Sequence, residues 1–431
     1  MNEMLKKRTI ISLVFVAFIV FAFVGVASGC TIGVASGKVT TDGRAMIWKI
    51  RDWSQKPNNE VYFNCSYKYK FVAVANAGER GVRMGLNEKG LALMNSNSTD
   101  MISAKKGPNA GEFQETAIGT CATVDEFEAL LKKTNVSGRK TRANIITLDA
   151  TGAVAIFETS GNEYFRYDAT DPNVAPDGFI IRSNFAFHGW AKESIEHVPW
   201  GVDRYNRSST IIKKLIDEGN LDYKNILHRN FRDFSEHWTS KPYSVPLEQQ
   251  VSQEIPLGYI QCHDSLCRDI TVSAAVVVGV LPGEESKLST LWSILGQTAC
   301  GIAIPYWPVG ETPPEANGPK TAPLCDAARN IKTLVFDYPD AANCINTYKL
   351  KDGKGDGLWK ILFPAEDRIF AETEAKLAKW RKSGPDVEEM LATESKFTKD
   401  ALATLEDAYK KLQTWKPNRG KITKQNTAGK L

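Results

Sequence analysis

Cys30 is the residue of this sequence best suited to nucleophilic chemistry, because of what precedes it. Basic residues 6–8 are followed by an apolar stretch over residues 10–26 and then by Ala27-Ser28-Gly29. This order is typical of a signal peptide with its cleavage site. Cleavage after Gly29 would make Cys30 the first residue. Its freed α-amino group would titrate near neutrality within reach of the thiol, and so could act as the general base.

Two other interpretations of this segment remain open. The apolar stretch is close to the roughly 18 to 20 residues that span a bilayer, so it could be a retained anchor. Ala-Ser-Gly-Cys also resembles a bacterial lipoprotein signal, which would place a lipid on Cys30. The small residues Ala27 and Gly29 favour cleavage. We therefore expect an exported protein (secreted, periplasmic or on the cell surface) that meets a membrane only through this segment or a lipid anchor.

The eight cysteines form no recognisable metal or redox motif. Cys262 and Cys267 have four residues between them, where a redox pair has two, and His263 has no paired ligand set around it. We therefore expect no metal and no organic cofactor. Export would favour disulfides. With Cys30 free, seven cysteines remain and at least one stays unpaired, and the sequence does not give the connectivity.

The composition excludes some classes of protein. The chain has 431 residues, of which 42% are hydrophobic and 24% charged, so it can bury a sizeable core. Its formal net charge of +4 is small and spread along the sequence, which removes the main electrostatic argument for a nucleic-acid partner. The sequence does not indicate an oligomeric state.

The elements that must position Cys30 are mostly short strands. A hairpin is predicted from Cys30 to about residue 52, with a turn at Thr41-Asp42-Gly43. Helices are predicted over 123–133 and 204–218. After residue 305 the chain is rich in proline to residue 323 and then helical over 365–380 and 386–412. Further strands are predicted at 67–75, 83–86, 91–95, 143–148, 153–159, 163–167, 178–183, 270–280 and 290–295.

The stretch CTIGVASGKVTTDGRAMIWKIRDW, residues 30–53, resembles the opening of the N-terminal-nucleophile amide hydrolases. These include choloylglycine hydrolases, acid-ceramidase-like enzymes, penicillin V acylase, isopenicillin N acyltransferase and carcinine hydrolase. The resemblance implies that Asp52 holds the amine of the nucleophile. The family's arginine three residues earlier is replaced by Lys49, and an arginine stands instead at Arg51. A lysine is a point charge where arginine offers a bidentate fork, so its partner would be held differently.

Two later blocks carry the same resemblance. MGLNEKGLALMNSNS, residues 84–98, resembles the Asn-Glu-x-Gly-Leu motif and implies an oxyanion-hole asparagine at Asn97, with Asn95 as the alternative. GFIIRSNFAF, residues 178–187, resembles the strand that ends in Thr-Asn, and implies a second oxyanion donor at Asn184. Arg204 matches the arginine-bearing helix that follows that strand.

The resemblance extends with gaps from Cys30 to about residue 308, and the isopenicillin N acyltransferase and carcinine hydrolase branch is the most similar. It implies an α+β fold, a four-layer αββα sandwich. The expected organisation is a signal peptide at 1–29, the hydrolase domain at 30–310, a mainly helical extension packed on it at 311–415, and a polar tail at 416–431.

The expected activity is hydrolysis of a linear amide through a thioester on Cys30. The substrate would be a small acylated amine or peptide-like amide, with penicillin V, bile-salt amides, N-acyl amino acids, β-alanyl amines and short peptides all open. The alternatives are acyl transfer from the same thioester, a lipid-anchored binding protein, and a cell-surface protein with an inactive fold.

Overall fold

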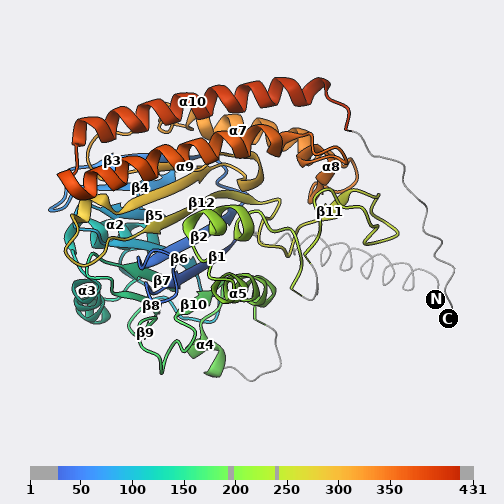
Figure 1. Ribbon diagram of the computed structural model, residues 1–431. Coiled ribbons are helices and arrows are strands. Elements are labelled where there is room, and N and C mark those ends of the chain that lie inside the picture. Colours follow the sequence, from blue (N-terminus) through green and yellow to red (C-terminus); the bar gives the residue numbers. More distant parts are fainter. Residues whose placement is uncertain (1–27, 193–198, 238–241, 418–431) are drawn as a thin grey trace, which may run out of the picture.

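The computed structural model describes residues 28–192, 199–237 and 242–417, which form two antiparallel sheets stacked between layers of helices (Figure 1). The predicted signal peptide lies outside this range except for Ser28 and Gly29, and the predicted tail except for residues 416 and 417. Within the described residues, no helix has the length and apolar character needed to cross a membrane.

The first sheet has six strands and contains Cys30. Its order is β10 (Phe179–Arg182), β1 (Ser28–Ala35), β2 (Met46–Trp53), β12 (Thr271–Val278), β13 (Thr290–Leu295) and β14 (Ile304–Tyr306). The predicted hairpin is therefore confirmed as β1 and β2, which pair from Ser28 opposite Trp53 to Ala35 opposite Met46.

The second sheet has seven strands that follow one another in chain order. They are β3 (Asn59–Asn64), β4 (Phe71–Asn76), β5 (Met84–Asn87), β6 (Ala92–Asn97), β7 (Ala143–Leu148), β8 (Val154–Thr159) and β9 (Tyr164–Asp168). A separate pair joins β11 (Tyr259–Gln261) to β15 (Cys344–Asn346).

The strands of the second sheet are apolar on both faces because each face is covered. Ala92 and Met94 of β6 belong to the core between the two sheets, whereas Leu91 and Leu93 belong to a second core with the helices. Successive side chains of a strand point to opposite faces, which separates the two sets. Near-continuous apolar runs in β6, β7 and β8 therefore reflect a layer buried inside the molecule.

The outer layers complete the αββα sandwich, and the expected fold class is confirmed. Helices α2 (Ala110–Thr120) and α3 (Val124–Ser137) cover the seven-stranded sheet. Helix α5 (Val202–Asp217) packs on β10 and β1, and α7 (Pro323–Val335) and α9 (Leu358–Ser383) pack near β13 and β14. Helix α10 (Val387–Thr414) packs on α7 and α9, and α9 and α10 run along one side of the molecule (Figure 1). The short helices are α4 (Phe187–Lys192), α6 (Tyr223–Asn225) and α8 (Thr347–Leu350).

Helix α9 is held to the sheet by a buried ionic cluster. Glu366 is fully buried and accepts hydrogen bonds from Arg232 at 2.8 and 2.9 Å, from the backbone N–H of Ala303 at 2.6 Å, and contacts His228 Nε2 at 2.6 Å. Burial alone would raise the pKa of Glu366, but Arg232 and His228 outweigh it and lower the pKa to about 2. The carboxylate is therefore charged across the ordinary pH range and ties α9 to two other segments, residues 228–232 and Ala303.

Glu394 of α10 has the opposite environment and gives a prediction on stability. It is buried with a hydrogen bond from the backbone N–H of Trp307 at 2.8 Å, and burial raises its pKa to about 8. The pKa of Glu394 in the folded protein exceeds its ordinary value of 4.5. The contribution of the protonated carboxyl to the free energy of unfolding is therefore fully present below pH 4.5 and is lost as the pH rises through 8. Relative to Glu394→Gln, the wild-type free energy of unfolding should fall by on the order of 3 kcal/mol between about pH 5 and 8. Urea unfolding at several pH values measures this, and parallel curves for the two proteins would contradict it.

Candidate active site

Cys30 lies in β1 and lines a cavity of about 370 Å³ that also receives most of the predicted site residues. The thiol-bearing residue is half-buried and stands opposite Arg51 of β2, while Gly29 stands opposite Asp52. The lining consists of Gly29, Cys30, Lys49, Arg51, Asp52, Trp53, Arg83, Asn95, Asn97, Asn109, Ala110, Lys140, Arg142 and Asn184.

The backbone nitrogen of Cys30 donates a hydrogen bond of 3.0 Å to Oδ1 of Asn184, two residues beyond the end of β10. The Arg204 Nη2 donates to the same atom at 2.7 Å, and a guanidinium has no acceptor, so this atom must be the amide oxygen. The Nδ2 of Asn184 donates to the backbone carbonyl of Asn97 at 2.9 Å. Asn184 therefore holds the nitrogen of Cys30 through its amide oxygen, and one N–H of its amide donates to Asn97. An amide N–H₂ group has two hydrogens, so the second remains for the expected oxyanion donation, which stays a prediction.

The peptide bond between Gly29 and Cys30 is enclosed by charged groups. A Cβ atom at Gly29 would lie 2.8 Å from Arg268 Nη1 and 3.0 Å from Arg204 Nη2, so a larger residue could not fit without displacing these side chains. Arg204 Nη1 also donates to the carbonyl oxygen of Cys30 at 2.7 Å. Arg268 Nη1 lies 3.4 Å from Oδ2 of Asp52. Two arginines and one carboxylate thus surround the bond whose cleavage would free the amine.

Asp52 is fixed by strand pairing and by a hydroxyl. Its Oδ1 accepts a hydrogen bond of 2.7 Å from Thr271 Oγ1, and Thr271 lies opposite it in β12. Burying a carboxylate requires such compensation. Asp52 is therefore held rigidly in the wall of the cavity that Cys30 also lines, where it would provide a negative charge for an α-ammonium group.

Lys49 is buried in the cavity wall. Its Nζ donates to Oδ1 of Asn95 at 3.1 Å and to the backbone carbonyl of Arg83 at 3.2 Å. Burial lowers the pKa of Lys49 to about 7, with Arg51 and Arg83 acting in the same direction and a Cys30 thiolate acting against them. The side chain therefore changes charge near neutrality next to the candidate nucleophile.

This gives a prediction on pH dependence. If charged Lys49 stabilises the Cys30 thiolate, kcat/KM must fall as Lys49 loses its proton, approaching about tenfold per unit above pH 7. Lys49→Arg keeps the positive charge to much higher pH and should remove this fall. The check is a pH profile of both proteins from about pH 5 to 10. Identical high-pH limbs would contradict a role for the Lys49 charge.

The two candidate asparagines of β6 differ in their surroundings. Asn95 is buried and bound to Lys49, whereas the Asn97 side chain is exposed and faces the cavity. Arg51 is buried with its guanidinium donating to Asn76 Oδ1 at 2.5 Å and to Asn59. The structure thus brings together every predicted site residue around Cys30, with Arg204 behind the Asn184 amide.

Several residues of the site were not predicted from the sequence. Arg83 directly precedes the Asn-Glu-x-Gly-Leu block, Lys140 and Arg142 precede β7, and Arg268 precedes β12. Arg83 is the first residue of a predicted strand and the other three stand just before one, and that position was the only available signal. Among the described residues, no group of three or more His, Cys, Asp or Glu side chains could hold a metal ion.

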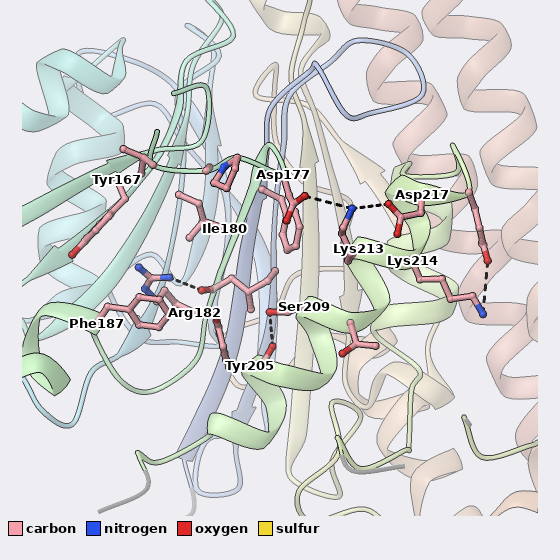
Figure 2. A pocket seen from close by; sticks show the side chains of 17 residues that line it. Tyr167, Asp177, Ile180, Arg182, Phe187, Tyr205, Ser209, Lys213, Lys214 and Asp217 are labelled. Atoms are coloured by element: carbon pink, nitrogen blue, oxygen red, sulfur yellow. Dashed lines mark hydrogen bonds and ion pairs between the residues drawn. The ribbon is translucent and has the colours of Figure 1, made fainter. Parts of the chain in front are cut away.

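A second cavity, of about 830 Å³, lies between α5 and β10 (Figure 2). It is lined by aromatic side chains such as Tyr167, Phe187 and Tyr205 and contains no cysteine. Figure 2 shows Lys213 between Asp177 and Asp217, at 3.4 and 2.6 Å. Because its lining holds no cysteine, this larger cavity is not the candidate active site.

One family model matches part of the chain. The model of the family described as acyl-coenzyme A:6-aminopenicillanic acid acyl-transferase matches residues 39–249, which include Asp52, Asn97, Asn184 and Arg204 and begin after Cys30. No curated protein matches the sequence.

The solved structures similar to the chain are distant. Penicillin V acylase from Agrobacterium tumefaciens is 16% identical with a TM-score of 0.37, covering 64% of this chain and 85% of that one. A variant of conjugated bile acid hydrolase from Clostridium perfringens is 13% identical with a TM-score of 0.37, covering 61% and 89%. The N-acylethanolamine-hydrolyzing acid amidase ortholog from Caenorhabditis elegans is 15% identical with a TM-score of 0.37, covering 58% and 92%.

The family model that matches residues 39–249 supports the resemblance to the N-terminal-nucleophile hydrolases, a group of amidases and acyltransferases, that the three sequence blocks indicated.

Proposed function

We propose that the protein is an exported cysteine amidase whose nucleophile, Cys30, is exposed as the N-terminal residue by cleavage after Gly29. The observation that carries the proposal is the contact between the Cys30 nitrogen and Asn184 Oδ1, inside a cavity that also holds Asp52. After cleavage, this contact would hold the freed α-amine of Cys30 in place next to the thiol of the same residue. Nucleophile and base would then be delivered by one residue.

The reaction follows from this arrangement. The α-amine takes the thiol proton, and the thiolate attacks the amide carbonyl of the substrate. The tetrahedral intermediate collapses as the ammonium returns a proton to the leaving amine, which leaves a thioester on Cys30. Water attacks the thioester, releases the carboxylic acid and restores the thiol.

The oxyanion of the tetrahedral intermediate needs donors. One N–H of Asn184 is engaged with Asn97, so we assign this role to the Asn97 side chain, which faces the cavity, together with the second N–H of Asn184. A preorganised donor of this kind contributes about 3 kcal/mol to the transition state. The match to an acyl-transferase family also supports a second candidate function, in which an amine or thiol intercepts the thioester and the product is a new acyl compound.

The test is intact mass and N-terminal sequencing of the protein purified from its export route, before and after treatment with a thiol-directed β-lactam probe. We expect a chain that begins at unmodified Cys30 and gains one adduct there. Cys65→Ala, which removes the exposed cysteine, is the matched control and should label normally. A diacylglyceryl group on Cys30 would overturn the proposal in favour of a lipid-anchored binding protein.

A further inference from the structure

The cavity at Cys30 is strongly cationic. Five of its lining residues carry basic side chains, namely Lys49, Arg51, Arg83, Lys140 and Arg142, and the one carboxylate of the lining is Asp52. Asp52 is already balanced by Arg268. Two cations of this set are fully buried, Arg83 is partly buried, and Lys140 and Arg142 stand exposed at the rim.

None of these five cations has a carboxylate within ion-pair distance among the residues that the structure describes. Lys49 and Arg51 are held by amide and carbonyl oxygens instead. Arg83 Nε is buried and has no hydrogen-bond partner in the described chain. The nearby Glu79 is engaged by Lys56 and Asn76. Buried charges of the same sign without a counter-ion are energetically costly. An anion that binds in this cavity would therefore lower the electrostatic free energy of the site.

The second cavity shows that this pattern is not general in the molecule. Its three lining cations are all paired with carboxylates. Arg182 pairs with Glu158 at 2.7 Å. Lys213 pairs with Asp177 and Asp217, and Lys214 with Glu218 at 3.7 Å (Figure 2). The excess of cations is therefore a property of the Cys30 cavity.

Two further features increase its positive potential. Arg51 and Arg83 both lie against the ring of Trp53, at 5.2 and 5.5 Å from its centroid, which fixes two guanidinium groups close together. The N-terminus of helix α2 contributes Asn109 and Ala110 to the lining, and the positive end of a helix dipole favours anions. Its first-turn carboxylate, Glu112, is used to cap the helix.

We propose that the substrate of this site is an amide that carries a carboxylate group, bound by the Arg83, Lys140 and Arg142 side of the cavity while Cys30 attacks the amide. The inference rests on the proposed function for the identity of the reaction. The claim that the cavity binds anions rests on the charges of the cavity alone. Anion binding and amide hydrolysis can therefore be tested separately.

The first measurement needs no substrate. Iodoacetate and iodoacetamide both alkylate a thiolate with loss of iodide, and they differ in one negative charge. We expect the ratio of iodoacetate to iodoacetamide rates to be about tenfold higher at Cys30 than at exposed Cys65, and to fall when salt rises from about 20 to about 500 mM. Peptide mass spectrometry reads both sites in one sample. Ratios within about twofold at Cys30 and Cys65 would overturn the inference.

The second measurement uses matched substrates. Phenylacetyl-4-aminobenzoate and glutaryl-4-nitroanilide carry a carboxylate on the amine side and the acyl side, and the corresponding carboxamides are their neutral partners. We expect kcat/KM of at least one acid to exceed that of its carboxamide by about tenfold to a hundredfold, as hydrogen bonds to charged groups allow. Combined Lys140→Gln and Arg142→Gln should reduce this ratio, whereas Lys132→Gln, an exposed cation on α3, should not.

The outcomes separate the two proposals. Hydrolysis of acids and carboxamides at equal rates would overturn the carboxylate inference and leave the amidase intact. A raised alkylation ratio at Cys30, with no hydrolysis and no probe adduct, would support the anion site and overturn the amidase.

Discussion

Replacing Cys30 by alanine is expected to lower kcat/KM for any amide substrate by roughly a thousandfold or more, because no other cysteine of the described residues lines the cavity. The remaining described cysteines other than Cys65 are buried, and burial raises the pKa of Cys262, Cys267, Cys300 and Cys325. These thiols are therefore poor substitutes. Steady-state kinetics on the purified mature variant measure the effect.

Two controls make this result specific. Cys65→Ala should retain full activity, because Cys65 is exposed and lies outside the cavity. Cys30→Ser keeps a hydroxyl nucleophile and should fold like the wild type while losing the thiol-directed adduct. Activity of Cys30→Ala within about tenfold of the wild type would exclude the thioester mechanism.

Replacing Glu366 by alanine is expected to destabilise the fold by about 3 to 5 kcal/mol, because it leaves Arg232 buried without its counter-ion. The backbone N–H of Ala303 would lose its acceptor as well. Because the folded pKa of Glu366 is below its ordinary value, the stability that it contributes is present above about pH 4.5 and is lost as the pH falls through about 2. Urea unfolding near neutral pH measures the change.

Glu372→Ala is the matched control for this prediction. Glu372 lies on the same helix, and its ion pair with Lys396 is exposed. Exposed pairs contribute about 0 to 1 kcal/mol, so this variant should unfold nearly as the wild type does. A similar small loss for Glu366→Ala would show that the buried cluster does not anchor α9.

The sequence allowed much of the site to be predicted because the key residues follow local signals. Cys30 is marked by its position after the small residues, and Asp52 and Asn184 by strand ends within recognisable blocks. The orientation of the Asn184 amide was not predictable, because it is fixed by Arg204 from a helix 20 residues further on. The cationic lining of the cavity was not predicted either, because its residues are distant in sequence and meet only where strand ends of both sheets converge.

The fold was predictable at the level of alternating strands and terminal helices, but some elements were missed. Strand β3 begins with Asn59 and Glu60, polar residues that the structure buries, so alternation of apolar side chains gave no signal. Helix α9 begins seven residues before the predicted helix at 365 and contains Pro364. A proline usually marks a helix boundary, and here packing on the sheet continues the helix through it.

Strand β1 starts ahead of the proposed cleavage point, since Gly29 pairs with Asp52 within the sheet. An uncut chain can therefore assemble the whole cavity while its nitrogen is still acylated and unable to accept a proton. Such a chain would be an inactive precursor that already has the folded active-site cavity. Hydrolysis of a single peptide bond would create a basic amine in the cavity that also holds Asp52, so that activation would require a change of charge and no rearrangement of the fold.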